Sequence, residues 1–318
     1  MAGLSRLALG LILLAPGSGI AAEFRYSSAL PDEGQVIDTR AQEQCQTMSL
    51  AGARCLPATD LLGPHRRLPS FRDILWVFGT AGLRGDETLI VAGSDPRERD
   101  FVAALLYLAG QREIVVLTEP LPRLLAAGAA AAPGEPRGMI RDPIYRASLR
   151  EHLIVLRREL WSELQDAAPP ALFDGRGDAE YRGERVRAQR GGRLPGAILL
   201  PAGELRASLT AEPRPTPAGL VGYAHDPLES LAYFTLLRAG AGFEARVYIQ
   251  GWRDWAARGE LPVDHETLPE PVSPRAMPTS AATAGPGLIQ QLLPVIALII
   301  ALLTLFIVIS RRSHRWTS

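Results

Sequence analysis

Two cysteines are the residues of this sequence with the most obvious chemical potential. Cys45 and Cys55 are the only cysteines in the chain. They lie in a part of the protein that we expect to be exported to an oxidising compartment, so a disulfide is favoured over two free thiols. The five histidines occur singly and there is no C-x-x-C pair, so the spacing of a zinc or haem site is missing. We therefore expect neither a metal nor a cofactor.

A second pattern, D-P-x-E, occurs twice, each time directly after a β-rich run. One copy begins at Asp95 and the other runs from Asp226 to Glu229. Asp at the N-cap, Pro at the first helical position and Glu at the third are typical of a helix start, and such a cap contributes about 1 kcal/mol. The alternative is an acid/base pair of His225 and Asp226, because α/β proteins place their sites at strand ends. No nucleophile or metal partner is recognisable nearby, so the structural interpretation is favoured.

Short β-rich runs alternate with helical patterns along the body of the chain. In the first half we expect strands at 35–40, 88–94 and 113–119, with helices at 68–82, 96–110 and 121–128. In the second half we expect strands at 171–176, 196–201, 219–225 and 244–251, with helices at 227–240 and 252–259. This alternation predicts an α/β fold with mainly parallel sheets.

The two halves repeat the same order of elements. Asp38 and Asp174 each lie near the end of a predicted strand, and Asp95 and Asp226 each open a predicted helix. The spacing between the members of the first pair is close to that of the second, which indicates two consecutive copies of one domain.

The N-terminal residues have the layout of a secretory signal. Arg6 precedes an apolar stretch from Leu7 to Ala15, and small residues stand before Glu23. The alternative, a short buried helix, does not explain why the apolar run gives way so abruptly to a polar chain. We expect cleavage after Ala22, and without a cysteine at that site a lipoprotein anchor is excluded.

The C-terminal region predicts a membrane anchor. The run Leu292–Ile309 is almost wholly aliphatic or aromatic and is long enough to cross a bilayer. Three arginines follow directly, at positions 311, 312 and 315, which keeps that end in the cytoplasm and the body outside it, in the periplasm or on the extracellular side. A buried core helix is the alternative, but such helices are seldom wholly apolar over this length.

These features divide the chain into consecutive parts. We expect a signal peptide at 1–22, a first domain at 23–135, a second domain with its leading segment at 136–263, a Pro-rich linker at 264–287, a transmembrane helix at 288–310 and a cytoplasmic tail at 311–318. The 34 basic and 34 acidic residues cancel, so a nucleic-acid partner is not expected. Every basic residue is arginine, which removes lysine Schiff-base chemistry.

Several segments resemble the tandem rhodanese-like proteins, the thiosulfate and mercaptopyruvate sulfurtransferases. They are LFDGRGDAEYRGE (172–184), GGRLPGAILLP (191–201) and VYIQGWRDWAARGELPV (247–263) in the second half. In the first half, VIDTR and LPSFRDILWVFGTAGLRGDETLIV, with the helix after them, are similar to the family's non-catalytic domain. The resemblance covers roughly residues 30–263 and implies two rhodanese-like domains.

The resemblance also implies where a catalytic cysteine would stand. The family holds it at the end of the central strand, where backbone N–H groups and a helix N-terminus stabilise thiolate and persulfide. Ala224 occupies the corresponding position in the second domain and Gly93 in the first. The loops around them carry Asp95 in one copy and His225, Asp226 and Glu229 in the other, so both positions are degenerate.

Two functions follow from this pattern. The first is a pseudo-enzyme that has lost sulfur transfer and serves as a membrane-tethered binding or assembly module for another envelope protein. The second is a sulfurtransferase or sulfur-handling enzyme with an atypical site, for which Cys45 and Cys55 are the only thiol candidates. These two cysteines are expected on the first domain's early helix and the next short strand, far from the helix N-terminus that would acidify them.

Overall fold

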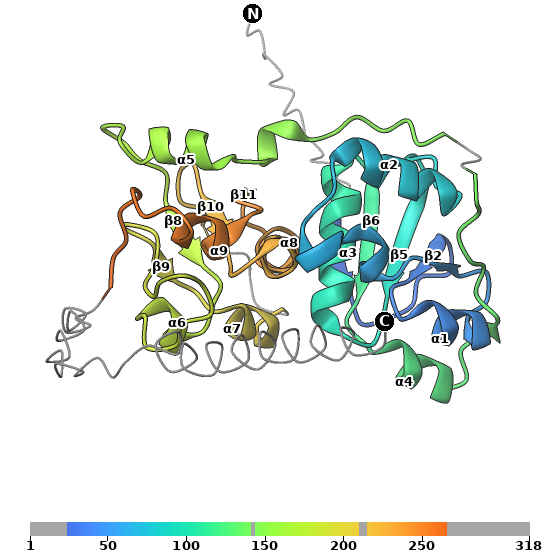
Figure 1. The fold of residues 1–318 in the computed structure, drawn as a ribbon. Helices are drawn as coiled ribbons and strands as arrows, with labels where there is room; N and C mark the ends of the chain where they lie inside the picture. The colour runs from blue at the N-terminus through green and yellow to red at the C-terminus, as the bar shows by residue number, and fades with distance from the viewer. Residues whose placement is uncertain (1–23, 141–143, 210–214, 266–318) are drawn as a thin grey trace, which may run out of the picture. The chain divides into compact units, whose positions relative to one another are not determined.

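The computed structural model describes residues 24–140, 144–209 and 215–265, which belong to one compact unit (Figure 1). The expected signal peptide, transmembrane helix and cytoplasmic tail, with nearly all of the linker, lie outside the described residues. Within the described ranges, no helix has the length and apolar character needed to cross a membrane. The fold below is therefore that of the predicted body of the protein.

The first half is built on a five-stranded sheet in which all strands are parallel, with the order β1-β6-β5-β2-β4. The strands are β1 (Phe24–Ser27), β2 (Gln35–Asp38), β4 (Arg54–Cys55), β5 (Thr88–Ala92) and β6 (Glu113–Leu117). The helices are α1 (Gln42–Thr47), α2 (Phe71–Thr80), α3 (Pro96–Leu108) and α4 (Leu121–Ala126). Two short strands, β3 (Ser49–Leu50) and β7 (Ala131–Ala132), pair antiparallel beside it.

The second half has a four-stranded parallel sheet with the order β11-β10-β8-β9. Its strands are β8 (Leu172–Asp174), β9 (Ile198–Leu199), β10 (Val221–Tyr223) and β11 (Arg246–Val247). Its helices are α5 (Arg157–Glu163), α6 (Asp178–Tyr181), α7 (Ala202–Ala207), α8 (Pro227–Thr235) and α9 (Gly251–Ala256). Short 3₁₀ turns occur at Ala58–Leu61, Pro64–Arg66 and Glu151–Leu153.

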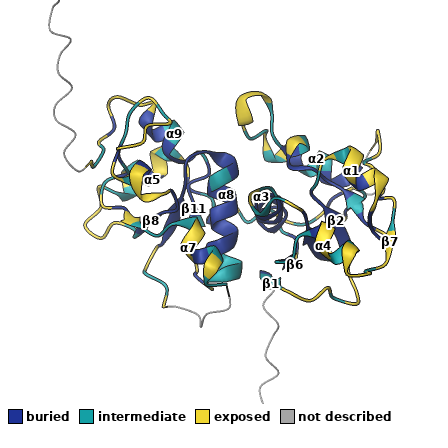
Figure 2. Cartoon of the chain, turned by 90° about the horizontal axis from the view of Figure 1, so that it is seen from below, coloured by how far each residue is buried: buried dark blue, intermediate teal, exposed yellow. Residues whose placement is uncertain are grey.

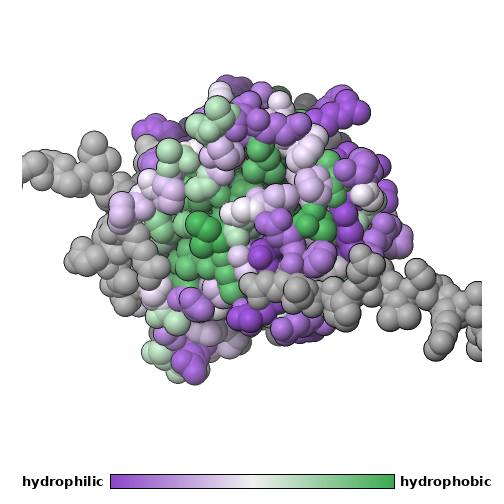
Figure 3. All heavy atoms as spheres, turned by 90° about the vertical axis from the view of Figure 1, so that its left-hand side faces the viewer, coloured by the Kyte–Doolittle hydropathy of each residue, from purple (hydrophilic) through white to green (hydrophobic). Residues whose placement is uncertain are grey.

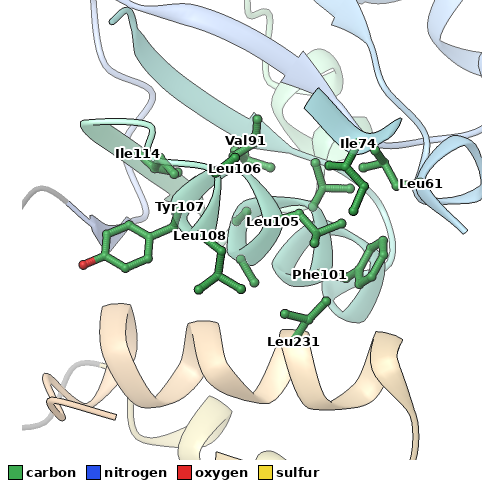
Figure 4. Packing of buried hydrophobic residues seen from close by; sticks show 14 of the residues in the cluster. Leu61, Ile74, Val91, Phe101, Leu105, Leu106, Tyr107, Leu108, Ile114 and Leu231 are labelled. Atoms are coloured by element: carbon green, nitrogen blue, oxygen red, sulfur yellow. The ribbon is translucent and has the colours of Figure 1, made fainter. Parts of the chain in front are cut away.

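Helices α3 and α8 join the two halves (Figure 2). Ten of the thirteen residues of α3 are buried, because both sides of the helix are covered by protein. Phe101 and Leu105 of α3 share one hydrophobic cluster with Leu231 and Phe234 of α8 (Figure 4). Burying such side chains contributes about 1.5–3 kcal/mol each, so this shared core ties the two sheets into one unit.

The predicted elements are present, but several are shorter than expected. The strand expected at 244–251 is reduced to Arg246–Val247, because its continuation turns into α9. The helix expected at 227–240 ends as an α-helix at Thr235 and continues as a single π-helical turn, Leu236–Gly240. Strand β1 was not expected: its four residues, FRYS, are too few to show a period, and their pairing with β6 is a long-range contact.

The surface of the second half is not uniformly polar. Figure 3 shows hydrophobic residues gathered near the centre of one face, with hydrophilic residues around them. Leu156, Val186 and Ile198 of this half are each more than half exposed. Exposed apolar groups of this kind are common singly and carry meaning only where they form a patch.

Candidate functional site

The loop after β10 is held by hydrogen bonds to the elements around it. Ala224 N donates to Ser230 Oγ at 3.0 Å, and Ala224 O accepts from Trp252 N at 2.8 Å. Asp226 Oδ1 accepts from Glu229 N at 3.1 Å, as expected for a helix N-cap, and Pro227 follows it in the first turn. The predicted helix start is therefore present, and it occupies backbone N–H groups that could otherwise face a ligand.

The equivalent loop of the first half has the same construction. Asp95 Oδ1 accepts from Arg97 N at 2.7 Å and from Glu98 N at 3.4 Å, which confirms the second predicted N-cap. Gly93 O accepts from Leu121 N at 2.9 Å. A carbon atom added at Gly93 would lie 2.2 Å from Thr39 Oγ1, so this position has no room for a side chain.

The two strand-end aspartates of the predicted repeat make matching ion pairs. Arg40 Nη2 lies 2.7 Å from Asp38 Oδ2, and Arg176 Nη2 lies 2.6 Å from Asp174 Oδ2. In both cases the backbone N–H of the arginine also donates to its aspartate at 3.0 Å. The hydroxyl of Tyr223 donates to Asp174 Oδ2 as well, at 2.6 Å.

Ala224 lines a cavity of about 300 Å³ at the carboxyl end of the second sheet. Its described lining includes five arginines, which come from both halves of the chain. Arg97 belongs to α3, Arg176 follows β8, and Arg206 lies on α7. Arg185 and Arg187 complete the set from the segment between α6 and β9. Such a cavity attracts small anions, because guanidinium groups donate to oxyanions through parallel N–H groups.

Two glutamates also line the cavity and are bound by one arginine. Arg187 Nε lies 2.7 Å from Glu180 Oε1, and Arg187 Nη1 lies 2.8 Å from Glu229 Oε1. Burial raises the pKa of Glu229, but the hydrogen bond and charge of Arg187 outweigh it, so the pKa lies below its usual value. Glu229 is therefore held ionised beside Arg187.

The side chain of His225 lies beside Glu180. Its side chain is 7 % exposed, and its Nδ1 lies 3.6 Å from Glu180 Oε2, with no hydrogen-bond partner for either atom among the described residues. Burial, and then the charge of Arg187, lower the pKa of His225, so the imidazole is neutral at pH 7. The expected partner, Asp226, instead turns its Oδ2 toward Arg66 at 3.9 Å and Arg253 at 3.8 Å.

The cysteines form the predicted disulfide. Cys45 of α1 and Cys55 of β4 are bonded, with their Cα atoms 5.8 Å apart, and both are fully buried. Because these are the only cysteines of the chain, no free thiol is left. Among the described residues, no group of three or more His, Cys, Asp or Glu side chains is arranged to hold a metal ion.

The arginines of the cavity were not singled out from the sequence. Arg97, the neighbouring residues Arg185 and Arg187, and Arg206 come from separate segments of a chain in which every basic residue is arginine. The only signal was a local concentration of arginines between α6 and β9, which residue spacing alone cannot distinguish from a solvated loop. Their convergence depends on the packing of the second half against α3.

Comparison with solved structures places this arrangement among known folds. A probable thiosulfate sulfurtransferase superposes with a TM-score of 0.54 at 25% sequence identity, over 74% of this chain and 99% of that one. The chain has a sulfurtransferase-like fold. No family model matches the chain, and no curated protein matches it.

Two further structures share the sulfurtransferase-like fold at lower identity. YnjE superposes with a TM-score of 0.59 at 18% identity, over 73% of this chain and 62% of that one. Wild-type EanB gives a TM-score of 0.59 at 18% identity, over 75% of this chain and 66% of that one. The chain thus spans less than two thirds of either protein, and at this identity the likeness shows the fold alone. The sulfurtransferase-like fold supports a function related to sulfur.

Proposed function

We propose that this chain is a membrane-anchored, extracytoplasmic protein of two rhodanese-like domains that binds and does not transfer sulfur. The observation that carries the proposal is the basic cavity at the end of β10, where Ala224 stands in place of a nucleophile. Sulfur transfer through a persulfide needs a thiolate to attack the donor. The methyl group of Ala224 cannot supply one, and both cysteines are bonded to each other.

The backbone around Ala224 supports the same conclusion. A persulfide site needs free N–H groups that converge on the sulfur and stabilise its negative charge. Here Ser230 Oγ accepts from the N–H of Ala224, and Asp226 accepts from the N–H of Glu229. Pro227 has no N–H. Loss of the chemistry therefore extends to the loop that would have activated a cysteine.

The cavity retains the means to bind an anion without reacting with it. Among the described residues, five arginines and two glutamates line it. Arg187 pairs with both glutamates. Three other arginines pair with aspartates: Arg97 with Asp95, Arg176 with Asp174 and Arg206 with Asp100. Arg185 has no carboxylate partner among the described residues, so its guanidinium can bind a small oxyanion through charge-assisted hydrogen bonds. We infer a receptor or assembly function in which an envelope protein binds this chain differently when the cavity holds an anion.

The proposal of two domains of one kind rests on the matched ion pairs. The Asp38–Arg40 pair lies at the end of β2, and the Asp174–Arg176 pair lies at the end of β8, the corresponding strand of the second sheet. The D-P-x-E segments also match. Asp95 caps α3 after β5, which pairs with β2, and Asp226 caps α8 after β10, which pairs with β8. A common ancestor for the halves explains why both features recur together.

The cellular location is tested by protease accessibility. We expect protease added to spheroplasts to digest the body and to spare the tail at 311–318, because the signal layout and the C-terminal arginines place them on opposite sides. Protection of the body would contradict the proposed topology.

Purification of the detergent-solubilised chain, followed by identification of co-purifying proteins, then tests whether it has a stable envelope partner.

The alternative is a sulfurtransferase with an atypical site. It is favoured by the likeness to a probable thiosulfate sulfurtransferase, and a variant of EanB with a similar fold carries a persulfide on a cysteine. The two functions are separated by assaying the full-length chain for thiocyanate formation from thiosulfate and cyanide. We expect none above background. Turnover that disappears in the Cys45→Ser/Cys55→Ser variant would establish the alternative.

Anion binding is measured on the same preparation by calorimetry with thiosulfate. We expect heat of binding that is reduced in Arg185→Gln, because this arginine lines the cavity. Arg158→Gln removes the same charge from the exposed side of α5 and serves as the control. Equal binding by both variants would mean that the anion does not bind in this cavity.

A further inference from the structure

A second cavity lined by arginines lies at the amino ends of strands β5 and β6 of the first sheet, and the proposed function does not use it. Its volume is about 770 Å³, and its lining includes four arginines, at positions 84, 112, 146 and 150; among the described residues, Asp86 is its one carboxylate. Residues 84–86 lie just before the amino end of β5, and Gly93 follows its carboxyl end. The cavity therefore lies at the end of the sheet opposite to the carboxyl ends of the strands, where α/β folds place their catalytic groups.

The walls of this cavity are fixed by the backbone. Arg146 N donates to Arg84 O at 2.8 Å, which joins the segment between the two halves to the turn before β5. Gly110 has a φ of +98°, and a carbon atom added there would lie 2.1 Å from Ser148 O. Only glycine accommodates this approach, so the segment is seated closely against the end of α3.

One of the four arginines is anchored by its surroundings. The guanidinium of Arg150 lies over the ring of Tyr107, 4.2 Å from its centre, and donates to Gln111 O at 3.1 Å. Stacking of this kind holds the planar group in one orientation. Its positive charge is therefore a constant feature of the cavity wall.

The other three arginines have no carboxylate partner among the described residues. Arg84, Arg112 and Arg146 are exposed, and within the described part of the chain none of them makes a side-chain hydrogen bond or ion pair. Elsewhere many arginines are paired, as Arg246 is with Glu163 at 2.6 Å. Like charges gathered in this way repel one another, so an anion that enters the cavity stabilises the fold.

We propose that this cavity binds a phosphate group with at least two negative charges. A phosphate presents several oxygens in different directions, and each guanidinium can engage two of them through its N–H fork. Arginines from three separate segments can thus contact one group at the same time. The phosphate belongs to a soluble phosphorylated molecule or to the phosphomonoester headgroup of a lipid, and the proposal stands independently of the cavity at β10.

The test uses the full-length chain in detergent and inorganic pyrophosphate as the probe. Calorimetry at fixed ionic strength should show saturable binding. The Arg84→Gln/Arg146→Gln variant should bind at least about tenfold more weakly, because it lacks two of the guanidinium groups that donate charged hydrogen bonds to the probe. Arg72→Gln on the exposed side of α2 is the matched control and should leave the affinity unchanged. Thermal unfolding confirms that each variant is folded.

A second titration with short-chain phosphatidic acid, below its micelle concentration, identifies the source of the phosphate, because the phosphomonoester of this lipid can carry two negative charges. Binding of pyrophosphate alone supports a soluble ligand. Binding of the lipid that is lost in the double variant supports a headgroup. Absence of binding by both probes, or an equal loss in Arg72→Gln, would overturn the proposal.

Discussion

Thr39 Oγ1 occupies the space that a side chain at Gly93 would need, at 2.2 Å from the position of its first carbon. The hydroxyl is held there because it donates to Ala92 O at 3.1 Å. Position 93 is therefore closed by its own neighbour from the adjacent strand, independently of any need for a nucleophile.

We expect Gly93→Cys to destabilise the protein and to add no reactive thiol. Overpacking in a buried site of this kind costs about 1–3 kcal/mol, which denaturant unfolding will measure. Gly203→Ala in α7 is the control, since an added carbon there meets no atom within 4 Å. A Gly93→Cys variant with unchanged stability and a thiol open to alkylation would show that the loop opens freely.

Ala224→Cys should restore little sulfur transfer, although it places sulfur at the cavity. Most of the arginines around the thiol are already paired with carboxylates such as Glu180 and Glu229, and the thiol would lack the free N–H groups that lower a cysteine pKa. We expect thiocyanate formation close to background for the full-length variant, measured beside an active sulfurtransferase. Turnover approaching that of the active enzyme would show that one side chain alone had been lost.

The buried disulfide should resist alkylation and support the fold. Mass spectrometry of the unreduced protein after alkylation should show no modified thiol at Cys45 or Cys55. Cys45→Ser/Cys55→Ser should lower the free energy of unfolding by an amount near the lower end of about 2–4 kcal/mol, because the closed loop is short. Full alkylation of both residues without reductant would contradict the bond.

His225 should make the protein less stable in mild acid. Its folded-state pKa lies below the unfolded value of about 6.5, so the unfolded chain binds the proton first as the pH falls. Stability is complete above that value and decreases as the pH drops below it. Unfolding measured from pH 7.5 to 5 should give a shallower slope in His225→Gln, whereas His152→Gln, at an exposed position, should keep the wild-type slope.

Asp100 should be the most costly single charge to remove from the contact of α3 with the second half. Its carboxylate is fully buried and lies 2.8 Å from Arg99 Nη2 and 2.7 Å from Arg206 Nη1. Asp100→Asn leaves Arg99 buried without a counter-charge, so we expect a loss of about 3–5 kcal/mol. Glu119→Gln removes a surface partner of Arg123, 3.9 Å away, and should cost less than about 1 kcal/mol.

Local features of the fold could be predicted because their causes are local. Both helix starts, at Asp95 and Asp226, depend on three or four consecutive residues whose side chains satisfy their own backbone. The parallel α/β class follows from the order of apolar runs and helical patterns. The Cys45–Cys55 bond followed from the absence of any other cysteine, given an oxidising compartment.

Features that depend on contacts between distant segments were decided only by the tertiary structure. An acid/base pair of His225 and Asp226 was the less favoured interpretation of the sequence, and packing turns His225 toward Glu180 and Asp226 toward Arg66 and Arg253. The arginines of both cavities have no local pattern, because each comes from a different element and the chain is rich in arginine throughout. A charge acquires a ligand-binding role from its neighbours in space, and residue order does not determine those neighbours.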